Sequence, residues 1–329
     1  MKLNNILADQ PAYRKKQIRE AVYKQLISNW DEALTLPKNL RDKLKQVMPL
    51  EISAEIVNDN KTRKAVITLN DGFKIESILI TNRDEHYTVC VSSQVGCPMA
   101  CTFCATGQMG FSRNLTTQEI VNQVLLFARE LKKSGDRVNN VVFMGMGEPL
   151  LNWYNVLEAI KLINSSSGLE IGARSISIST CGMPEGIREI IEFPLQINLA
   201  ISLHAPNDDL RSQLMPMASQ YSIKEIWREL KNYLAVKKRK VMIEYIMIDN
   251  INDNELYAEE LVGLVIELPK SLLMVNLIPY NPTGKYKVSS QNQIQKFKQV
   301  LKGHGIEVIV RESLGGEIFG ACGQLANRK

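Results

Sequence analysis

Cys97-Pro98-Met99-Ala100-Cys101-Thr102-Phe103-Cys104 carries three of the six cysteines in this chain. The spacing, C-x-x-x-C-x-x-C, falls within one loop, so the three thiols can converge on one metal centre. Iron–sulfur clusters are normally held by four thiolates. A cubane held by only three would leave one iron open to a small molecule. The spacing favours such a centre.

Two other interpretations of the three cysteines stay open at this point. Zinc would need a fourth nitrogen or sulfur ligand, usually from a second paired motif, and the sequence contains no such pair. Three buried cysteines that are close only by coincidence are the third interpretation. Spacing alone favours the iron–sulfur cluster over both.

Length and composition predict a cytoplasmic enzyme. With 329 residues, 45% of them hydrophobic, the chain can bury a large core, and its length suggests one large domain with an appendage. Residues 1–11 lack the apolar core of a signal peptide, and the apolar run 261–266 is too short to span a membrane. Cysteines in such a chain are expected to be ligands or reactants, not disulfide staples.

The positive charge is concentrated at the N-terminus. Residues 1–50 contain ten Lys or Arg and five Asp or Glu, which accounts for the whole net charge of +5. Apolar residues recur at helical spacing over 13–30, and a second helix fits 38–47. The basic face is either ordinary solvated surface or a phosphate-binding surface for RNA, and composition leaves both open.

A β-hairpin is predicted next, with strands at 65–69 and 73–80 on either side of Asn70-Asp71-Gly72. Glu76 lies within the second strand. A carboxylate in a strand most often faces water, and this is the default expectation for Glu76.

Strands and helices then alternate, which predicts an α/β fold with a parallel sheet, either doubly wound or curled into a barrel. Strands are expected at 88–92, 140–145, 174–180, 196–203, 240–247, 273–280 and 306–311. Helices are expected at 116–133, 153–164, 184–192, 222–236, 254–268 and 291–302, the first opened by a capping box of Thr116 and Glu119.

The carboxyl ends of parallel strands meet on one rim, where the site of such a fold lies. The cysteine loop follows the first strand, and polar or glycine-rich segments end four others. A lone Gly-x-Gly or a lone histidine is weak evidence, since His204 alone would more often be structural. Their convergence opposite a cluster is stronger evidence. The four segments are 145–149, 179–182, 202–204 and 280–282.

The chain also contains the strings VSSQVGCPMACTFCATG, GFSRNLT, FMGMGEPLLN, LAISLHAPND, NLIPYNP and ACGQL. These strings resemble the RlmN/Cfr family of radical S-adenosylmethionine (radical SAM) RNA adenine methyltransferases, and they resemble its RlmN side. The resemblance extends from about residue 13 to 325 and implies a six-stranded partial (β/α) barrel of the radical SAM type. It implies a helical, RNA-binding accessory domain at 1–62, a connecting hairpin at 63–86 and a barrel with a methyl-carrier loop at 87–329.

The resemblance also implies cofactors and their ligands. Cys97, Cys101 and Cys104 would hold one [4Fe-4S] cluster, whose free iron binds S-adenosylmethionine, two molecules of which are used per turnover. The positions that match the cosubstrate site are Gly147, Glu148, Ser179, Ser202, Leu203, His204 and Asn281.

Three further residues receive roles from the family. Cys322 matches the methyl carrier, an S-methylcysteine intermediate, and Cys90 matches the thiol that forms a transient disulfide with it. Glu76 matches the proposed proton acceptor, and this match favours a catalytic role for Glu76 over the default expectation that it faces water. The implied target is carbon 2 of an adenosine in 23S rRNA, with tRNA as a second substrate in some members. An electron donor such as flavodoxin or ferredoxin, and a monomeric enzyme, are also implied.

Two rival functions remain. Methylation at carbon 8, as in Cfr, is the closer one; an RNA-binding protein with a structural cluster is the other, although it would need neither Cys90 nor Cys322.

The sequence departs from the family at Phe319-Gly320, just before the carrier. Cys181 has no assigned role and is expected to be a packed thiol of the rim.

Overall fold

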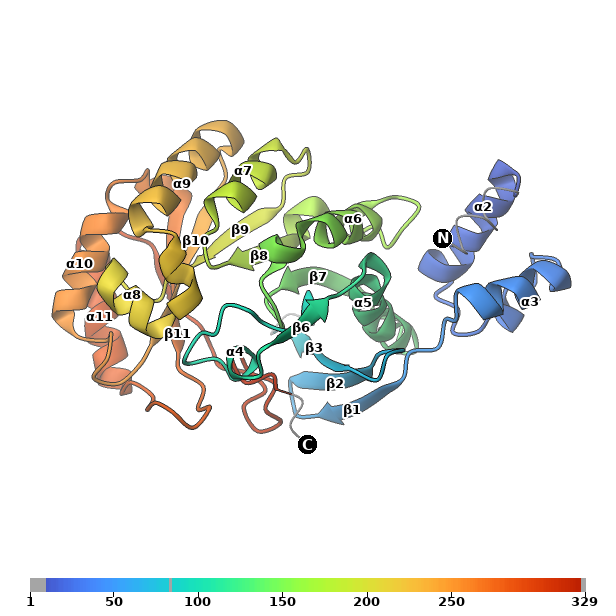
Figure 1. Ribbon diagram of the computed structural model, residues 1–329, viewed down its shortest axis with the longest axis horizontal. Helices are drawn as coiled ribbons and strands as arrows, with labels where there is room; N and C mark the ends of the chain where they lie inside the picture. Colours follow the sequence, from blue (N-terminus) through green and yellow to red (C-terminus); the bar gives the residue numbers. More distant parts are fainter. Residues whose placement is uncertain (1–9, 83–84, 327–329) are drawn as a thin grey trace.

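A ten-stranded sheet organises the molecule (Figure 1). The computed structural model describes residues 10–82 and 85–326. From the fourth strand onward all neighbouring strands are parallel. These strands are, in spatial order, β4 (Tyr87–Cys90), β7 (Val138–Phe143), β8 (Ile176–Thr180), β9 (Asn198–Ser202), β10 (Val241–Met247), β11 (Leu273–Pro279) and β12 (Val308–Val310).

Helices follow the strands and cover the outer face of the sheet (Figure 1). In α5 the predicted capping box forms, since Thr116 accepts from the Glu119 backbone N–H and the Glu119 side chain binds the Thr116 N–H. Burying each large apolar side chain of such a helix contributes about 1.5–3 kcal/mol. The helices are α5 (Thr117–Lys132), α6 (Trp153–Asn164), α7 (Pro184–Glu192), α9 (Ile223–Lys237), α10 (Glu255–Val265) and α11 (Gln291–Gly303).

The sheet is curved into a partial barrel. Side chains from β7, β8, β9, β10 and β11 line one cavity, which a flat sheet could not achieve. The edge strands of the sheet are its first and last members in spatial order, so it does not close. Six βα units followed by a seventh strand confirm the predicted α/β partial barrel.

The predicted hairpin is part of a larger antiparallel meander made of β1 (Ala54–Asn58), β2 (Thr62–Thr68) and β3 (Lys74–Thr81). Because β3 also pairs with β4, the meander and the barrel share one sheet. The sequence analysis missed β1, which lies within residues 1–62, where helices were expected. Four of its five residues are exposed, so it lacks the apolar alternation that identifies a strand.

The first N-terminal helix is shorter than predicted. Helix α2 (Ala12–Arg19) continues as one π-helical segment, η1 (Glu20–Lys24), and Leu26 then takes a left-handed conformation with φ of 52°. Trp30 therefore belongs to a separate turn, where its buried indole donates to the Met48 carbonyl at 2.7 Å. The second helix, α3 (Lys38–Val47), has the predicted bounds.

The cysteine loop is held by elements that the sequence analysis did not predict. A small ribbon of β5 (Gln94–Gly96) and β6 (Phe111–Asn114) closes its base, and α4 (Ala105–Gln108) follows the last cysteine. Helix α8 (Asp208–Leu214) accepts from the Thr102 N–H through its Leu214 carbonyl at 2.9 Å. A Cβ on Gly107 would lie 2.8 Å from the Cys101 backbone nitrogen, so this tight turn requires glycine.

In residues 10–82 and 85–326, no helix has both the length and the apolar character that crossing a membrane requires.

Candidate active site

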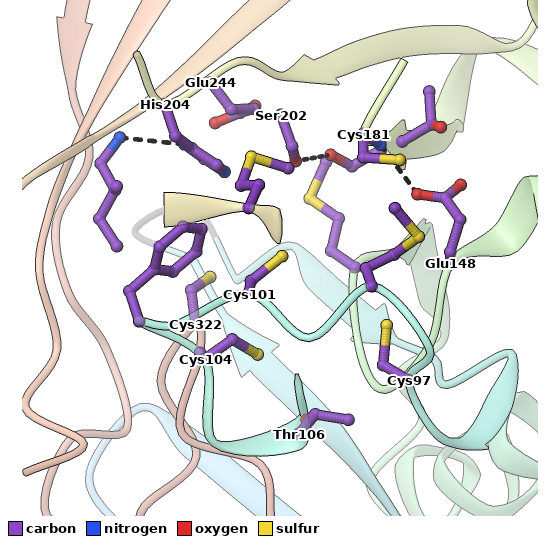
Figure 2. Close-up of a pocket in the computed structure, with 18 of the residues that line it drawn as sticks. Cys97, Cys101, Cys104, Thr106, Glu148, Cys181, Ser202, His204, Glu244 and Cys322 are labelled. Atoms are coloured by element: carbon purple, nitrogen blue, oxygen red, sulfur yellow. Dashed lines mark hydrogen bonds between the residues drawn. The ribbon is translucent and has the colours of Figure 1, made fainter. Parts of the chain in front are cut away.

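A cavity opens at the carboxyl ends of the barrel strands, where the shared rim was expected. Five of the chain's six cysteines line it: Cys97, Cys101, Cys104, Cys181 and Cys322. Figure 2 shows the cluster-loop thiols on one side of this cavity and the side chains of the strand ends on the other. We call it the cosubstrate cavity.

The three cluster-loop cysteines are free thiols. Burial raises the pKa of Cys97 to about 12 and also raises that of Cys104. Thiols buried in this way are inert unless a metal takes the place of the proton. Among the described residues, no group of three or more His, Cys, Asp or Glu side chains is arranged so that it could hold a metal ion. The three soft sulfur donors nevertheless have the chemistry that an iron–sulfur cluster requires.

Glu148 is a buried carboxylate at the rim. It accepts from the backbone N–H groups of Leu150 at 3.0 Å and Cys181 at 2.8 Å, while burial raises its pKa. Beside it, Gly147 has φ of 102°, and a Cβ there would lie 2.6 Å from the Gln94 Cβ. Gln94 also accepts from the Glu148 N–H at 2.9 Å, so the ribbon β5–β6 holds the loop that carries Glu148.

Ser179 and Ser202 lie on neighbouring strands, with their hydroxyl oxygens 3.1 Å apart. Both line the cosubstrate cavity. Leu203 is fully buried and does not line it; its backbone N–H instead donates to the Glu244 carbonyl. The structure thus brings together the two predicted serines, whereas Leu203 supports the rim by packing.

His204 is neutral in this environment. Burial, with a smaller effect from the positive charge of Arg211, lowers its pKa to about 3. Its Nδ1 accepts from the Ile246 N–H at 3.1 Å, so the proton of the neutral ring is on Nε2. The edge-to-face contact with Phe103, at 5.0 Å between ring centroids, joins this histidine to the cysteine loop.

A second cavity adjoins the first and shares a wall with it. Cys322 and Arg311 line both cavities, whereas Cys90 and Asn281 line only the second. Burial raises the pKa of the Cys90 thiol to about 12, with an additional effect from the neighbouring Cys322. We call this second space the carrier cavity, because the predicted methyl carrier and its thiol partner meet there.

Two hydrogen bonds anchor the loop around Cys322, which we call the carrier loop. Asn281 donates to the Cys322 carbonyl at 2.9 Å, and the Ala105 N–H donates to the Gly323 carbonyl at 2.7 Å. Ser313 donates to the Asn281 side chain. Asn281 therefore holds the carrier loop in this structure. Phe319 takes a left-handed conformation with φ of 51°, and its side chain is exposed, whereas Gly320, the other departure from the family pattern, lines the carrier cavity.

Glu76 does not face water, so the default expectation for it is wrong. Its side chain is 1% exposed, lies 3.3 Å from the Lys64 ammonium and accepts from the Ala326 N–H at 3.0 Å. The C-terminal segment covers this face of β3, which explains the burial. Glu76 lines neither cavity in the described part of the chain.

Two charged residues that line the cosubstrate cavity were not predicted, Glu244 and Arg311. Glu244 is buried in the middle of β10, where one carboxylate oxygen accepts from Asn276 and the other has no hydrogen-bond partner in the described part of the chain. A charged residue in an otherwise apolar buried strand was the available signal. Arg311 follows the last strand, a position at which polar residues are common and carry little information.

Comparison with known proteins identifies the family. The model of the radical SAM superfamily matches residues 91–260. The "Probable dual-specificity RNA methyltransferase RlmN" of Dictyoglomus thermophilum is 44% identical over 320 residues, 96% of this chain and 91% of the relative. The chain belongs to the RlmN family of radical SAM proteins. The "Dual-specificity RNA methyltransferase RlmN" of Lawsonia intracellularis is 42% identical over 326 residues, covering 95% of this chain and 90% of that one.

Solved structures agree with membership of the RlmN family. The crystal structure of a radical SAM methyltransferase from Sphaerobacter thermophilus has a TM-score of 0.93 and 40% identity, covering 98% of this chain and 95% of that one. Radical SAM proteins use a [4Fe-4S] cluster and S-adenosylmethionine, and these are the cofactors of this RlmN-family chain. The three free thiols of the cysteine loop fit the cluster by number and chemistry.

Proposed function

We infer that this chain is a radical SAM RNA methyltransferase that adds a methyl group to carbon 2 of adenosine through an S-methylcysteine at Cys322. One observation supports it most: Cys322 lines both the cavity of the cluster-loop thiols and the cavity of Cys90. A single sulfur can therefore take a methyl group on one side and pass it on at the other.

Cys97, Cys101 and Cys104 are the proposed cluster ligands, and a cluster held by three thiolates would keep one iron open for S-adenosylmethionine. The cluster, when bound, supplies the electron that cleaves this cosubstrate to a 5′-deoxyadenosyl radical. Ser179, Ser202 and the neutral His204 line the cavity opposite these thiols and offer hydroxyl and ring N–H groups to it. Gly147, Glu148, Leu203 and Asn281 complete the proposed cosubstrate site, the last two by supporting it.

Carbon 2 of adenine is an electrophilic amidine carbon, so a methylsulfonium cannot methylate it by ordinary nucleophilic attack. In the proposed reaction the Cys322 thiolate first takes the methyl group of one cosubstrate molecule. Hydrogen removal from that methyl group, by the radical that a second molecule would supply, would give a methylene radical that adds to the base. Loss of one electron from the adduct, to the cluster that had supplied one, would leave it closed-shell. The result is a covalent protein–RNA adduct.

Cys90 and Glu76 have the proposed roles in resolving this adduct. Cys90 attacks the Cys322 sulfur and releases the methylated RNA, leaving a disulfide for an external reductant. Glu76 accepts the proton of carbon 2. In this structure the Ala326 N–H donates to the Glu76 carboxylate, so the segment after Cys322 must move before Glu76 can accept a proton from the base.

RNA is the substrate class that the names of the relatives indicate. We propose an adenosine in 23S rRNA and one in the tRNA anticodon loop as the two targets. An electron donor of the flavodoxin or ferredoxin type, action as a monomer and residence in the cytoplasm complete the proposal. The segment 1–62, which contains α2, α3 and the strand β1, is the proposed RNA-binding accessory domain, 63–86 the connection and 87–329 the catalytic barrel.

Mass spectrometry of nucleosides tests this function directly. 23S rRNA and tRNA from cells without this protein are each treated with the reconstituted enzyme, cosubstrate and reductant. We expect 2-methyladenosine in both, and none when Cys322→Ala replaces the enzyme. The 8-methyl isomer would indicate the activity of Cfr, and unmodified RNA bound by a cluster-containing protein would indicate a structural cluster.

The basic face of α2 gives a prediction about RNA capture. Changing Arg14, Lys15, Lys16 and Arg19 to Ala should weaken RNA binding and lower its salt dependence by about one unit or less per lost phosphate contact. Arg14 donates to the Thr35 carbonyl at 2.9 Å and lies one turn from the buried Ile18, so circular dichroism is used to check that the variant keeps its fold. Cosubstrate cleavage without RNA should be unchanged.

The matched control for this prediction replaces Lys296 and Lys302, two exposed lysines of α11, with Ala. In Figure 1 this helix lies on the side of the barrel away from α2. Filter binding over a series of salt concentrations measures both variants. If the salt dependence of RNA binding were equal for the wild type and the α2 variant, this face would be ordinary solvated surface and not a phosphate-binding surface.

A further inference from the structure

Arg311 places a positive charge at the junction of the two cavities. Its backbone N–H donates to the Leu277 carbonyl at 2.8 Å, which fixes the residue beside β11, and its side chain lines both cavities. The guanidinium lies 3.9 Å from the Met144 sulfur. Among the described residues Arg311 makes no ion pair within 4.0 Å, so no carboxylate directly neutralises its charge.

The groups that face this guanidinium come from three elements. Cys322 of the carrier loop has the strongest effect on it, followed by Glu244 of β10 and Cys90 of β4, and together they raise the pKa of Arg311. Burial raises the pKa of Glu244, which favours its neutral form. The two thiols are then the groups that can become anions beside a permanent cation.

Cys90 must lose its proton to react, although its thiol is buried. Only a thiolate attacks another sulfur, yet burial holds the pKa of Cys90 at about 12. Arg311 is the positively charged side chain that acts against this burial. The Met144 backbone N–H also lowers the pKa, and the Ser77 hydroxyl holds the Cys90 carbonyl at 2.8 Å, which fixes the strand but adds no charge.

We propose that Arg311 is a positioning residue for product release, and that its guanidinium stabilises the Cys90 thiolate that attacks Cys322. The proposal rests on the proposed function. The bond between the Cys322 sulfur and the methylene carbon breaks, and its electron pair stays on that carbon, which takes up a proton and becomes the methyl group. The two sulfurs are joined in a disulfide and lose two electrons, which the carbon gains.

Arg311→Ala, tested by chemical rescue, separates charge from shape. The variant is reconstituted with its cluster, methylated at Cys322 and mixed with RNA for a single turnover. We expect the covalent adduct to accumulate in a denaturing gel and its release to slow by about tenfold or more. Millimolar ethylguanidinium should restore release, whereas ethylurea, its neutral counterpart of the same shape, should not. Equal rescue by both would show a packing role and overturn the proposal.

The pH dependence gives a second readout. Below the thiol pKa the thiolate fraction rises about tenfold per pH unit, so alkaline pH should speed release in Arg311→Ala. Arg311→Lys keeps the charge and should release faster than Arg311→Ala at each pH. If Arg311→Ala does not load its cluster, Arg311→Gln replaces it in the comparison with Arg311→Lys. Equal release by the charged and neutral variants would overturn the proposal.

Cys90→Ala is the reference for the whole experiment. If Cys90→Ala traps no adduct, the release step of the proposed function is wrong, and Arg311 has nothing to assist. If Cys90→Ala traps the adduct while Arg311→Ala releases it at the wild-type rate, the function stands and only the role of Arg311 is wrong. Alkylation of Cys90 by iodoacetamide, followed by peptide mass spectrometry, measures the same charge effect without turnover: it should be slower in Arg311→Ala.

Discussion

The Cys90→Ala protein is expected to carry a methyl group on Cys322 and then to stop as a protein covalently attached to RNA. In the proposed mechanism, methyl transfer to the Cys322 sulfur is polar chemistry in the cosubstrate cavity, which Cys90 does not line. Cys90 is needed only in the carrier cavity, where the adduct must be broken. Cys322→Ala should fail earlier and yield neither methylcysteine nor methylated RNA.

Intact-protein mass spectrometry shows the methyl group, and a nuclease-sensitive shift in a denaturing gel shows the adduct. Cys181→Ala is the matched control, because Cys181 is also a buried thiol of the cosubstrate cavity but has no proposed role in transfer. It should complete both steps. Normal turnover of Cys90→Ala, with no trapped RNA, would show that some other group resolves the adduct.

Loss of the cluster is the second large effect that we expect. Anaerobically purified wild-type protein should contain about four irons per chain and a broad visible absorption that dithionite bleaches. Cys101→Ala should lose both, because two thiolates cannot hold a cubane, and cosubstrate cleavage should be abolished. Iron analysis and absorption spectroscopy measure this without any RNA.

Cys181→Ala again provides the control, since it removes a thiol from the same cavity without touching the cysteine loop. It should keep its iron. Stoichiometric zinc without iron in the wild-type protein would rule out the radical mechanism and restore the zinc interpretation of the three cysteines.

The barrel could be predicted well because its signals are local. Each parallel strand is a short apolar run, and the helices between them begin at recognisable caps such as Thr116 and Ser222. Several helices, α6 and α7 among them, have the predicted bounds. The rule that a parallel sheet binds at its carboxyl ends then identified the rim, and the structure brings Glu148, Ser179, Ser202 and His204 together there.

The features that were missed depend on contacts between distant segments. Glu76 is buried because the C-terminal segment reaches back to β3, a contact across 250 residues that no local pattern contains. Arg311 and Glu244 enter the cavity because the sheet curves, and the degree of curvature is not written in the strand sequences. The edge strand β1 was missed because most of its residues are exposed, so its sequence does not alternate between apolar and polar residues.

The wall shared by the two cavities limits how turnovers can follow one another. Cys322 lines both cavities, so in the proposed mechanism a new methyl group cannot be loaded until the previous one has left with its RNA and the disulfide has been reduced. Catalytic cycles in one molecule therefore cannot overlap in time. The first burst of product should equal the fraction of molecules that were already methylated, and the steady rate that follows should depend on the supply of thiol reductant.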